Sequence, residues 1–257
     1  MRNILAIAHK ELKAYFSSPI AYIVIGLWAL MYGYFFVALM NFFVRQSMQM
    51  NQFGMQGPQA MNVNQQLIRP LLQNVLILIL FLMPMVTMRA YSEEKRSGTI
   101  ELLLTSPVTD WQIILGKFFG ALALYAVMLA VTLIHIGVLF IYGNPEWKPI
   151  ATTYLGLLLF GGCFISVGLL ISSLTKNQIV AFTASFGVFL LLWIIDWMGS
   201  FAGPTVNSLL TYLSVIGHLE DFTKGVLDTT HLIYYLSFIT FGLFLTAKSV
   251  DSERWRG

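Results

Sequence analysis

The sequence predicts an all-α membrane protein with six transmembrane helices. Hydrophobic residues make up 57% of the 257 positions and charged residues only 11%, whereas an ordinary soluble domain has about 25% charged residues. Six stretches approach the roughly 20 apolar residues that a helix needs to cross a bilayer. Helices are expected because lipid cannot satisfy the open edge of a sheet. The expected spans are 20–44, 71–88, 113–142, 150–175, 178–197 and 232–247.

The same composition excludes other classes of protein. The abundance of large apolar side chains excludes a disordered chain, and a single cysteine, Cys163, excludes a disulfide-stapled secreted domain. The net charge of +3 is too small to suggest a nucleic-acid partner. The expected surrounding is therefore a lipid bilayer. Because the spans leave little chain over, we expect a single transmembrane domain over residues 1–257.

Residues 2–16 precede the first span and predict an amphipathic helix on the cytoplasmic membrane surface. The motif Ser17-Ser18-Pro19 separates this helix from the span, which is too long to be the core of a signal peptide. The helix is either a plain membrane anchor or also a contact for a cytoplasmic partner. Its apolar residues recur at helical spacing: Ile4, Leu5, Ala8, Leu12, Tyr15 and Phe16.

The loop 45–70 is rich in Gln, Asn and Met and is expected outside the membrane. Thioether sulfurs can bind a soft ion such as Cu(I), but no His or Cys joins the methionines of this loop. A flexible polar loop is therefore favoured, and no metal site is expected. The methionines are Met48, Met50, Met55 and Met61.

The segment between spans 2 and 3, residues 89–110, carries densely spaced charges and a short apolar set of Ile100, Leu103 and Leu104. Pro107 stops this helix, and Thr109 or Asp110 caps the next one. The pattern favours a short amphipathic helix that lies across the cytoplasmic ends of the two spans and docks on a partner. The alternative is a solvated loop.

The connection 198–231 is expected outside and is half apolar. Its apolar run is too short to span, so we expect helices that enter the outer leaflet and return, broken at Gly203-Pro204 and Gly217. A divalent metal on His218, Glu220 and Asp221 is not favoured, because adjacent Glu220 and Asp221 would point in different directions on a helix.

The distribution of basic residues predicts the orientation. Eleven of the 15 Lys and Arg fall at the two termini, between spans 2 and 3, and between spans 4 and 5. The positive-inside rule therefore places both termini in the cytoplasm.

Inside the spans ionisable groups are few. His135 is expected to be neutral and hydrogen-bonded to a neighbouring helix, and small residues along 150–175 predict close helix packing.

No motif predicts catalysis by this chain. The pair Gly116-Lys117 lacks the other residues of a phosphate-binding loop, and the common zinc-protease, redox and serine-hydrolase motifs do not occur. An ion- or proton-coupled carrier is disfavoured, because such a carrier normally has carboxylates near the middle of its spans. The chain is therefore not expected to be an enzyme.

The chain resembles the membrane subunit of type-2 ABC exporters in its N-terminal helix, its six spans, and the stretch RAYSEEKRSGTIELLLTSPVT at 89–109 followed by Gln112 and Gly116-Lys117. The resemblance implies a bacterial inner-membrane permease, without a cofactor of its own, that pairs with a second permease chain near spans 2 and 5. It also implies a separate ABC ATPase subunit that binds ATP and Mg and docks on the segment between spans 2 and 3, called the coupling helix. The implied docking residues are Glu93, Glu94, Lys95, Arg96, Gly98, Thr99 and Glu101.

Two further stretches, NQIVAF at 177–182 and GHLEDFTKGVLDTTHLIYY at 217–235, are similar to the gliding-motility-associated branch of these permeases. The implied function is ATP-driven movement of a substrate outward across the membrane. The alternative is a membrane subunit that delivers mechanical force to an envelope or gliding machine without transporting cargo.

Overall fold

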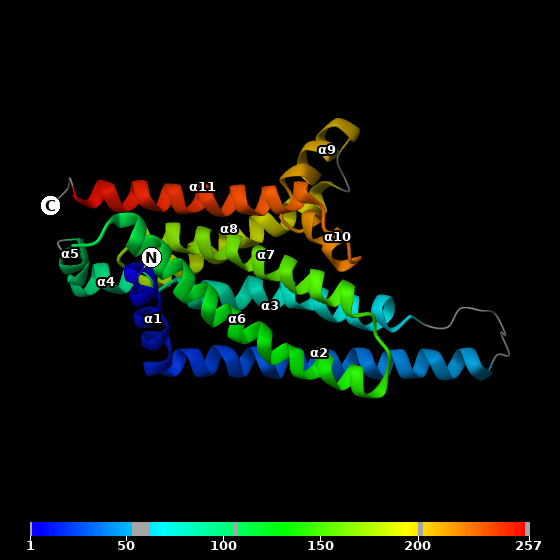
Figure 1. Cartoon of the computed structure of the whole chain (residues 1–257). Coiled ribbons are helices and arrows are strands. Elements are labelled where there is room, and N and C mark those ends of the chain that lie inside the picture. Colours follow the sequence, from blue (N-terminus) through cyan, green and yellow to red (C-terminus); the bar gives the residue numbers. More distant parts are fainter. Residues whose placement is uncertain (1, 53–61, 105–106, 200–202, 255–257) are drawn as a thin grey trace.

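The computed structural model describes residues 2–52, 62–104, 107–199 and 203–254, and within these ranges the regular structure is entirely helical. Six helices are long and apolar enough to cross a membrane, as predicted. They run lengthwise beside one another (Figure 1). These helices are α2 (Pro19–Gln52), α3 (Arg69–Thr87), α6 (Asp110–Tyr142), α7 (Trp147–Ser173), α8 (Gln178–Gly199) and α11 (Thr229–Arg254).

Helices α3 and α7 form the centre of the bundle. In the most apolar stretch of each of these spans 67% is buried inside the chain, against 17% for α2 and α8. Glycines allow this close approach: a Cβ atom at Gly168 of α7 would lie 2.2 Å from the Thr87 hydroxyl of α3. A Cβ at Gly161 would lie equally close to the Tyr125 ring of α6. The prediction that the fourth span packs closely is therefore confirmed.

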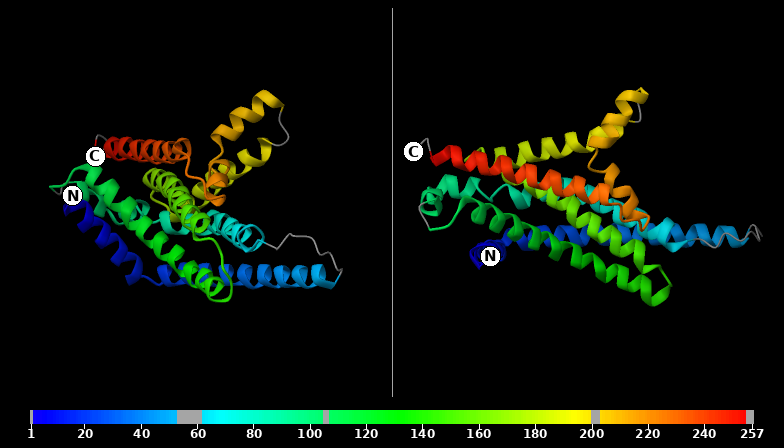
Figure 2. Two further views of the ribbon diagram at one scale, coloured as in Figure 1. Left: turned by 45° about the vertical axis from the view of Figure 1, so that its right-hand side comes forward. Right: turned by 45° about the horizontal axis from the view of Figure 1, so that its top comes forward.

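The two ends of the bundle differ in what they carry. The N-terminal helix α1 (Arg2–Ser17), the end of α11, and the short helices α4 (Ser92–Ser97) and α5 (Thr99–Leu104) gather at one end (Figures 1 and 2). We call this the inner end. The outer end carries the π-helix η1 (Asn64–Ile68), α9 (Pro204–Leu213), the 3-10 helix η2 (Gly217–Leu219) and α10 (Glu220–Thr223). The two termini thus share one end, as six crossings require.

Several local expectations change. The expected coupling helix is two short helices, because Gly98 adopts a φ of +74° between α4 and α5. The hydrogen bond expected for His135 is absent from the described part of the chain: its ring packs at 5.2 Å against Tyr32 and at 5.1 Å against Phe36, and its buried Nδ1 has no partner there. Aromatic packing takes the place of that bond.

Helix α9 leans away from the bundle (Figure 2), and entry of this region into the outer leaflet stays a prediction. The soft-metal prediction for Met55 and Met61 lies outside the described residues, as does any account of the side chains of Met50, Leu103 and Leu104.

Candidate functional site

The candidate site is the inner end, where α1 is seated on α6 through two glycines four residues apart. A Cβ atom at Gly116 would lie 2.5 Å from the Ile7 side chain, and one at Gly120 would lie 2.7 Å from Cβ of Glu11. Only glycine lets the backbones approach so closely. The N-terminal helix therefore packs on the protein itself, in addition to any contact that it makes with the membrane surface.

Between these glycines Lys117 carries a buried charge, with a side chain only 2% exposed. Its ammonium group lies 3.1 Å from Oε1 of Glu11 and 2.9 Å from Oε1 of Glu94, and donates a 2.7 Å hydrogen bond to the carbonyl of Ala90. It also lies 5.0 Å from the centre of the Tyr91 ring. One cation thus joins α1, α4 and α6, and breaking such a buried set typically costs about 3–5 kcal/mol.

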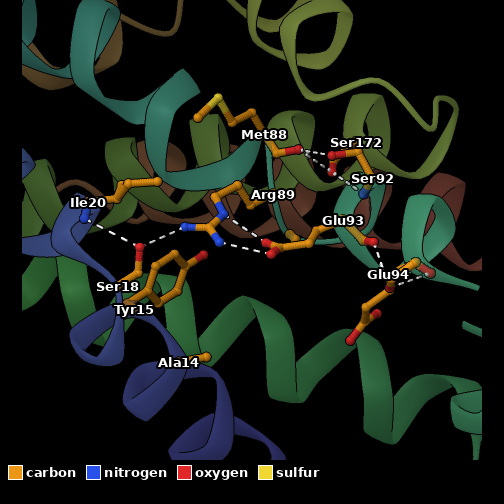
Figure 3. A network of polar contacts seen from close by, with 12 residues as sticks. Ala14, Tyr15, Ser18, Ile20, Met88, Arg89, Ser92, Glu93, Glu94 and Ser172 are labelled. Atoms are coloured by element: carbon orange, nitrogen blue, oxygen red, sulfur yellow. Dashed lines mark hydrogen bonds and ion pairs between the residues drawn. The ribbon is translucent and has the colours of Figure 1, made fainter. Parts of the chain in front are cut away.

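Arg89 ties the same corner to the junction of α1 and α2 (Figure 3). Its guanidinium donates two hydrogen bonds, of 2.7 and 2.9 Å, to the Glu93 carboxylate and a third, of 3.0 Å, to the Ser18 hydroxyl. Beside it the Tyr15 hydroxyl donates to the carbonyl of Val86 at 2.9 Å. Burial raises the pKa of the Tyr15 phenol, so the group stays a neutral donor.

Ser172, at the end of α7, holds the beginning of α4. Its hydroxyl accepts hydrogen bonds from the backbone N–H groups of Tyr91 at 3.0 Å and Ser92 at 3.1 Å, and donates one to the carbonyl of Met88 at 3.0 Å (Figure 3). These N–H groups belong to the start of a helix, which lacks partners within the helix itself. Helix α4 is therefore fixed to the central helix α7.

The structure divides the seven predicted docking residues. Glu93 and Glu94 make the ion pairs described above, and the Lys95 side chain is buried. The remaining four are exposed, together with Leu102 of α5, which is 72% exposed. Ile100 instead packs on the core. The exposed four are Arg96, Gly98, Thr99 and Glu101. We call these four and Leu102 the outer face of the α4–α5 segment.

Reasoning from the sequence missed the residues that support this segment: Glu11, Ser18, Lys117 and Ser172. One signal was present, because Lys117 is a charge inside an apolar stretch and follows the first of two glycines spaced for helix packing. Such a charge needs a partner, but the sequence does not say which one. Within the described residues no group of three or more His, Cys, Asp or Glu could hold a metal. The paired charges can keep α1, α4 and α6 in one relative position, and the Ser172 hydroxyl adds α7.

Comparisons with known proteins agree with this architecture. The family model described as "ABC-2 family transporter protein" matches residues 5–251. The chain is 33% identical over 146 residues to the "Probable multidrug ABC transporter permease YbhR" of Escherichia coli strain K12, and to the protein of the same description in strain O157:H7. Each match covers 55% of this chain and 38% of the relative, so the chain spans well under half the length of these relatives. The six apolar helices and the family match together establish that this multi-pass membrane protein belongs to the ABC-2 family of transporter proteins.

Proposed function

We propose that the chain is the permease subunit of an ATP-driven exporter, in which a separate ATPase subunit binds ATP and Mg and its hydrolysis cycle moves a substrate outward. The family match supports a permease with an ATPase partner. The Escherichia coli relatives are described as probable multidrug permeases, which supports export as the direction of movement. In this proposal the chain forms the route of the substrate across the membrane, and the ATPase subunit supplies the catalytic groups.

The observation that carries this proposal is the outer face of the α4–α5 segment and the bonds behind it. A partner that closes on Arg96, Thr99 and Glu101 would push on the α4–α5 segment, in which α4 is bonded to α6 and α7. Lys117 would pass the displacement to α6 and α1, and Ser172 would pass it to α7. Paired buried charges suit this role, because they resist separation more strongly than exposed ones.

The inner end is proposed to face the cytoplasm of a bacterium, with the chain in the inner membrane and both termini inside. The positive-inside rule supports this orientation. A reporter fused after residue 257 should then be active only in the cytoplasm, and one inserted near residue 56 only outside. A reversed pattern at either position would overturn the orientation.

A second permease chain, identical or related, is proposed to complete the transporter. The resemblance places the interface between the two permease chains near spans 2 and 5, which are α3 and α8, but the two helices differ in free surface. Helix α8 is mostly uncovered within this chain and can meet a partner, whereas α3 is central and has little free surface. We therefore keep α8 at the proposed interface and withdraw α3 from it.

The test is to purify the chain alone and together with its ATPase subunit. The chain alone should not hydrolyse ATP, and the pair should. The double variant Arg96→Glu/Glu101→Lys should weaken co-purification about 10-fold, equal to about 1.4 kcal/mol. Lys148→Glu, a reversal of an exposed charge at the outer end, is the matched control. Hydrolysis by the isolated chain, or normal binding by the double variant, would refute the proposal.

The assignment to the gliding-motility branch stays part of this proposal, supported by the two stretches at 177–182 and 217–235. Identification of the chains that co-purify in mild detergent would test it. Recovery of gliding-machinery components would support the assignment, and recovery of the ATPase alone would count against it.

A further inference from the structure

A groove at the inner end lies between the start of α6 and the end of α11, away from the coupling network. Its volume is about 480 Å³, within the range of pockets that bind small molecules. One wall comes from α6 and the turn before it, and the other from the last turns of α11. The lining residues are Val108, Thr109, Asp110, Trp111, Phe244, Ala247, Lys248 and Asp251.

We place the groove at the level of the lipid headgroups from the length of α11. A span of about 20 residues that begins at Thr229 ends near Lys248, so Lys248 and Asp251 fall where the hydrocarbon core gives way to headgroups. Trp111 and Phe244 are both exposed beside them. Aromatic rings at this depth are typical of the membrane interface. The groove is therefore apolar toward the core and charged toward the cytoplasm.

Within the described residues the two α11 charges, Lys248 and Asp251, have no ion-pair partner. The ammonium group of Lys248 lies 5.8 Å from the centre of the Phe244 ring. Lys117 and Arg89 at the same end are fully paired. A cation and an anion that stand three residues apart on one helix face, yet unpaired, suit a ligand with both charges.

We infer that this groove binds the headgroup of a zwitterionic aminophospholipid of the cytoplasmic leaflet, such as phosphatidylethanolamine. The lipid phosphate would pair with Lys248, and the ethanolamine ammonium would donate to Asp251. An anionic lipid without an ammonium would leave Asp251 unpaired, so phosphatidylglycerol is disfavoured. The glycerol backbone and the first acyl carbons would lie against Trp111 and Phe244. This inference rests on the proposed orientation of the inner end toward the cytoplasm, but not on the coupling proposal.

The experiment presents the purified full chain with an equimolar mixture of phosphatidylethanolamine, phosphatidylcholine and phosphatidylglycerol that share the same acyl chains. Native mass spectrometry then counts the lipids retained. Phosphatidylethanolamine should be retained about 5-fold over each of the others, the factor expected from one well-placed charge contact at a partly exposed site. Equal retention of the three lipids, or preference for phosphatidylglycerol, would overturn the inference.

Two variants separate the two contacts. Asp251→Asn should remove the preference for ethanolamine over choline, because choline has no N–H to donate, while leaving phosphate binding intact. Lys248→Ala should lower retention of phosphatidylethanolamine and phosphatidylcholine together, by about 5-fold. Lys176→Ala, a change of another exposed lysine at the inner end, is the control and should change nothing. If both groove variants keep the parent's lipid profile, the inference fails. If they instead lose the ATPase subunit, the groove belongs to that partner.

Discussion

The inner and outer ends of the bundle both hold networks of charged side chains, but they are built differently. At the inner end Lys117 is 2% exposed and its two carboxylate partners are 14% and 17% exposed. At the outer end Lys224 pairs with Glu220 at 3.0 Å and Asp221 at 3.2 Å, while these three side chains are 40–56% exposed. Similar distances thus occur in very different surroundings.

The difference matters because water screens exposed ion pairs, which contribute about 0–1 kcal/mol, whereas removing one partner of a buried pair costs several times more. At the outer end, η2 and α10 are held mainly by side-chain packing. A Cβ atom at Gly156 of α7 would lie 2.7 Å from Leu219 and 2.8 Å from Phe222. The ring of His218 stacks on Tyr234 with centres 3.8 Å apart. Buried charges therefore add to close helix packing at the inner end, whereas the outer end depends mainly on side-chain packing.

The largest effect should come from the inner cation. Lys117→Met removes the buried cation from the half-buried Glu11 and Glu94, leaves Glu94 only the exposed Lys10 at 3.9 Å, and should destabilise the protein by about 3–5 kcal/mol. Thermal unfolding in detergent measures this loss. Adding Glu11→Gln and Glu94→Gln to that variant should recover part of it, because the uncompensated charges are gone. A Lys117→Met variant that melts like the parent would show that the inner network is not held by charge.

A packing change should have the next largest effect, at the outer end. Gly156→Leu forces side-chain atoms into Leu219 and Phe222, and overpacking of this kind costs about 1–3 kcal/mol. Hydrogen exchange should accelerate in η2 and α10 and stay unchanged in α4. Gly187→Leu, at a glycine with open space around it, is the matched control. Acceleration at the inner end as well would contradict the separation of the two ends.

A smaller loss of stability should follow when the pH is lowered and His218 is protonated. Burial lowers the pKa of His218 below its ordinary value near 6.5, so the unfolded chain takes up this proton before the folded one does. The stabilisation is therefore complete above about pH 6.5 and is lost as the pH falls toward the folded pKa. After correction for the intrinsic pH dependence of amide exchange, the protection of η2 should fall as the pH drops below about 6.5. His218→Phe keeps a ring for stacking and should remove this dependence; a dependence that persists would assign the effect to another group.

Below that range, Asp221 continues the same trend. Hydrogen bonds from His231 at 3.0 Å and from Lys224 lower the pKa of its carboxyl group. Its contribution is present above the unfolded pKa and lost as the pH falls further. Because the site is open to water, this step should be weaker than the one at His218.

The smallest effect should come from the exposed outer cation. Lys224→Ala removes the ion pairs with Glu220 at 3.0 Å and Asp221 at 3.2 Å. The melting temperature should nevertheless not change measurably, because water replaces both contacts. Salt should likewise have little influence on the parent's melting temperature through this cluster. A drop comparable to that of Lys117→Met would break the comparison between the two ends.

The sequence by itself determined the six spans, their approximate limits and the shared end of the two termini. These follow from local composition, because a bilayer demands a run of apolar residues wherever the chain crosses it. It also located the segment between spans 2 and 3 as the place where charges concentrate. Each of these features can be read from neighbouring residues without knowing what they touch.

Only the tertiary structure decided which of those charged residues face inward. Glu94 turns inward toward Lys117 and is only 17% exposed, and Lys117 is buried because glycines at 116 and 120 let α1 close over it. These partners are far apart in the chain: Lys117 meets Glu11 across 106 positions. A pattern in the sequence cannot supply such a pairing, because the strength of a charge contact depends on the burial that packing creates.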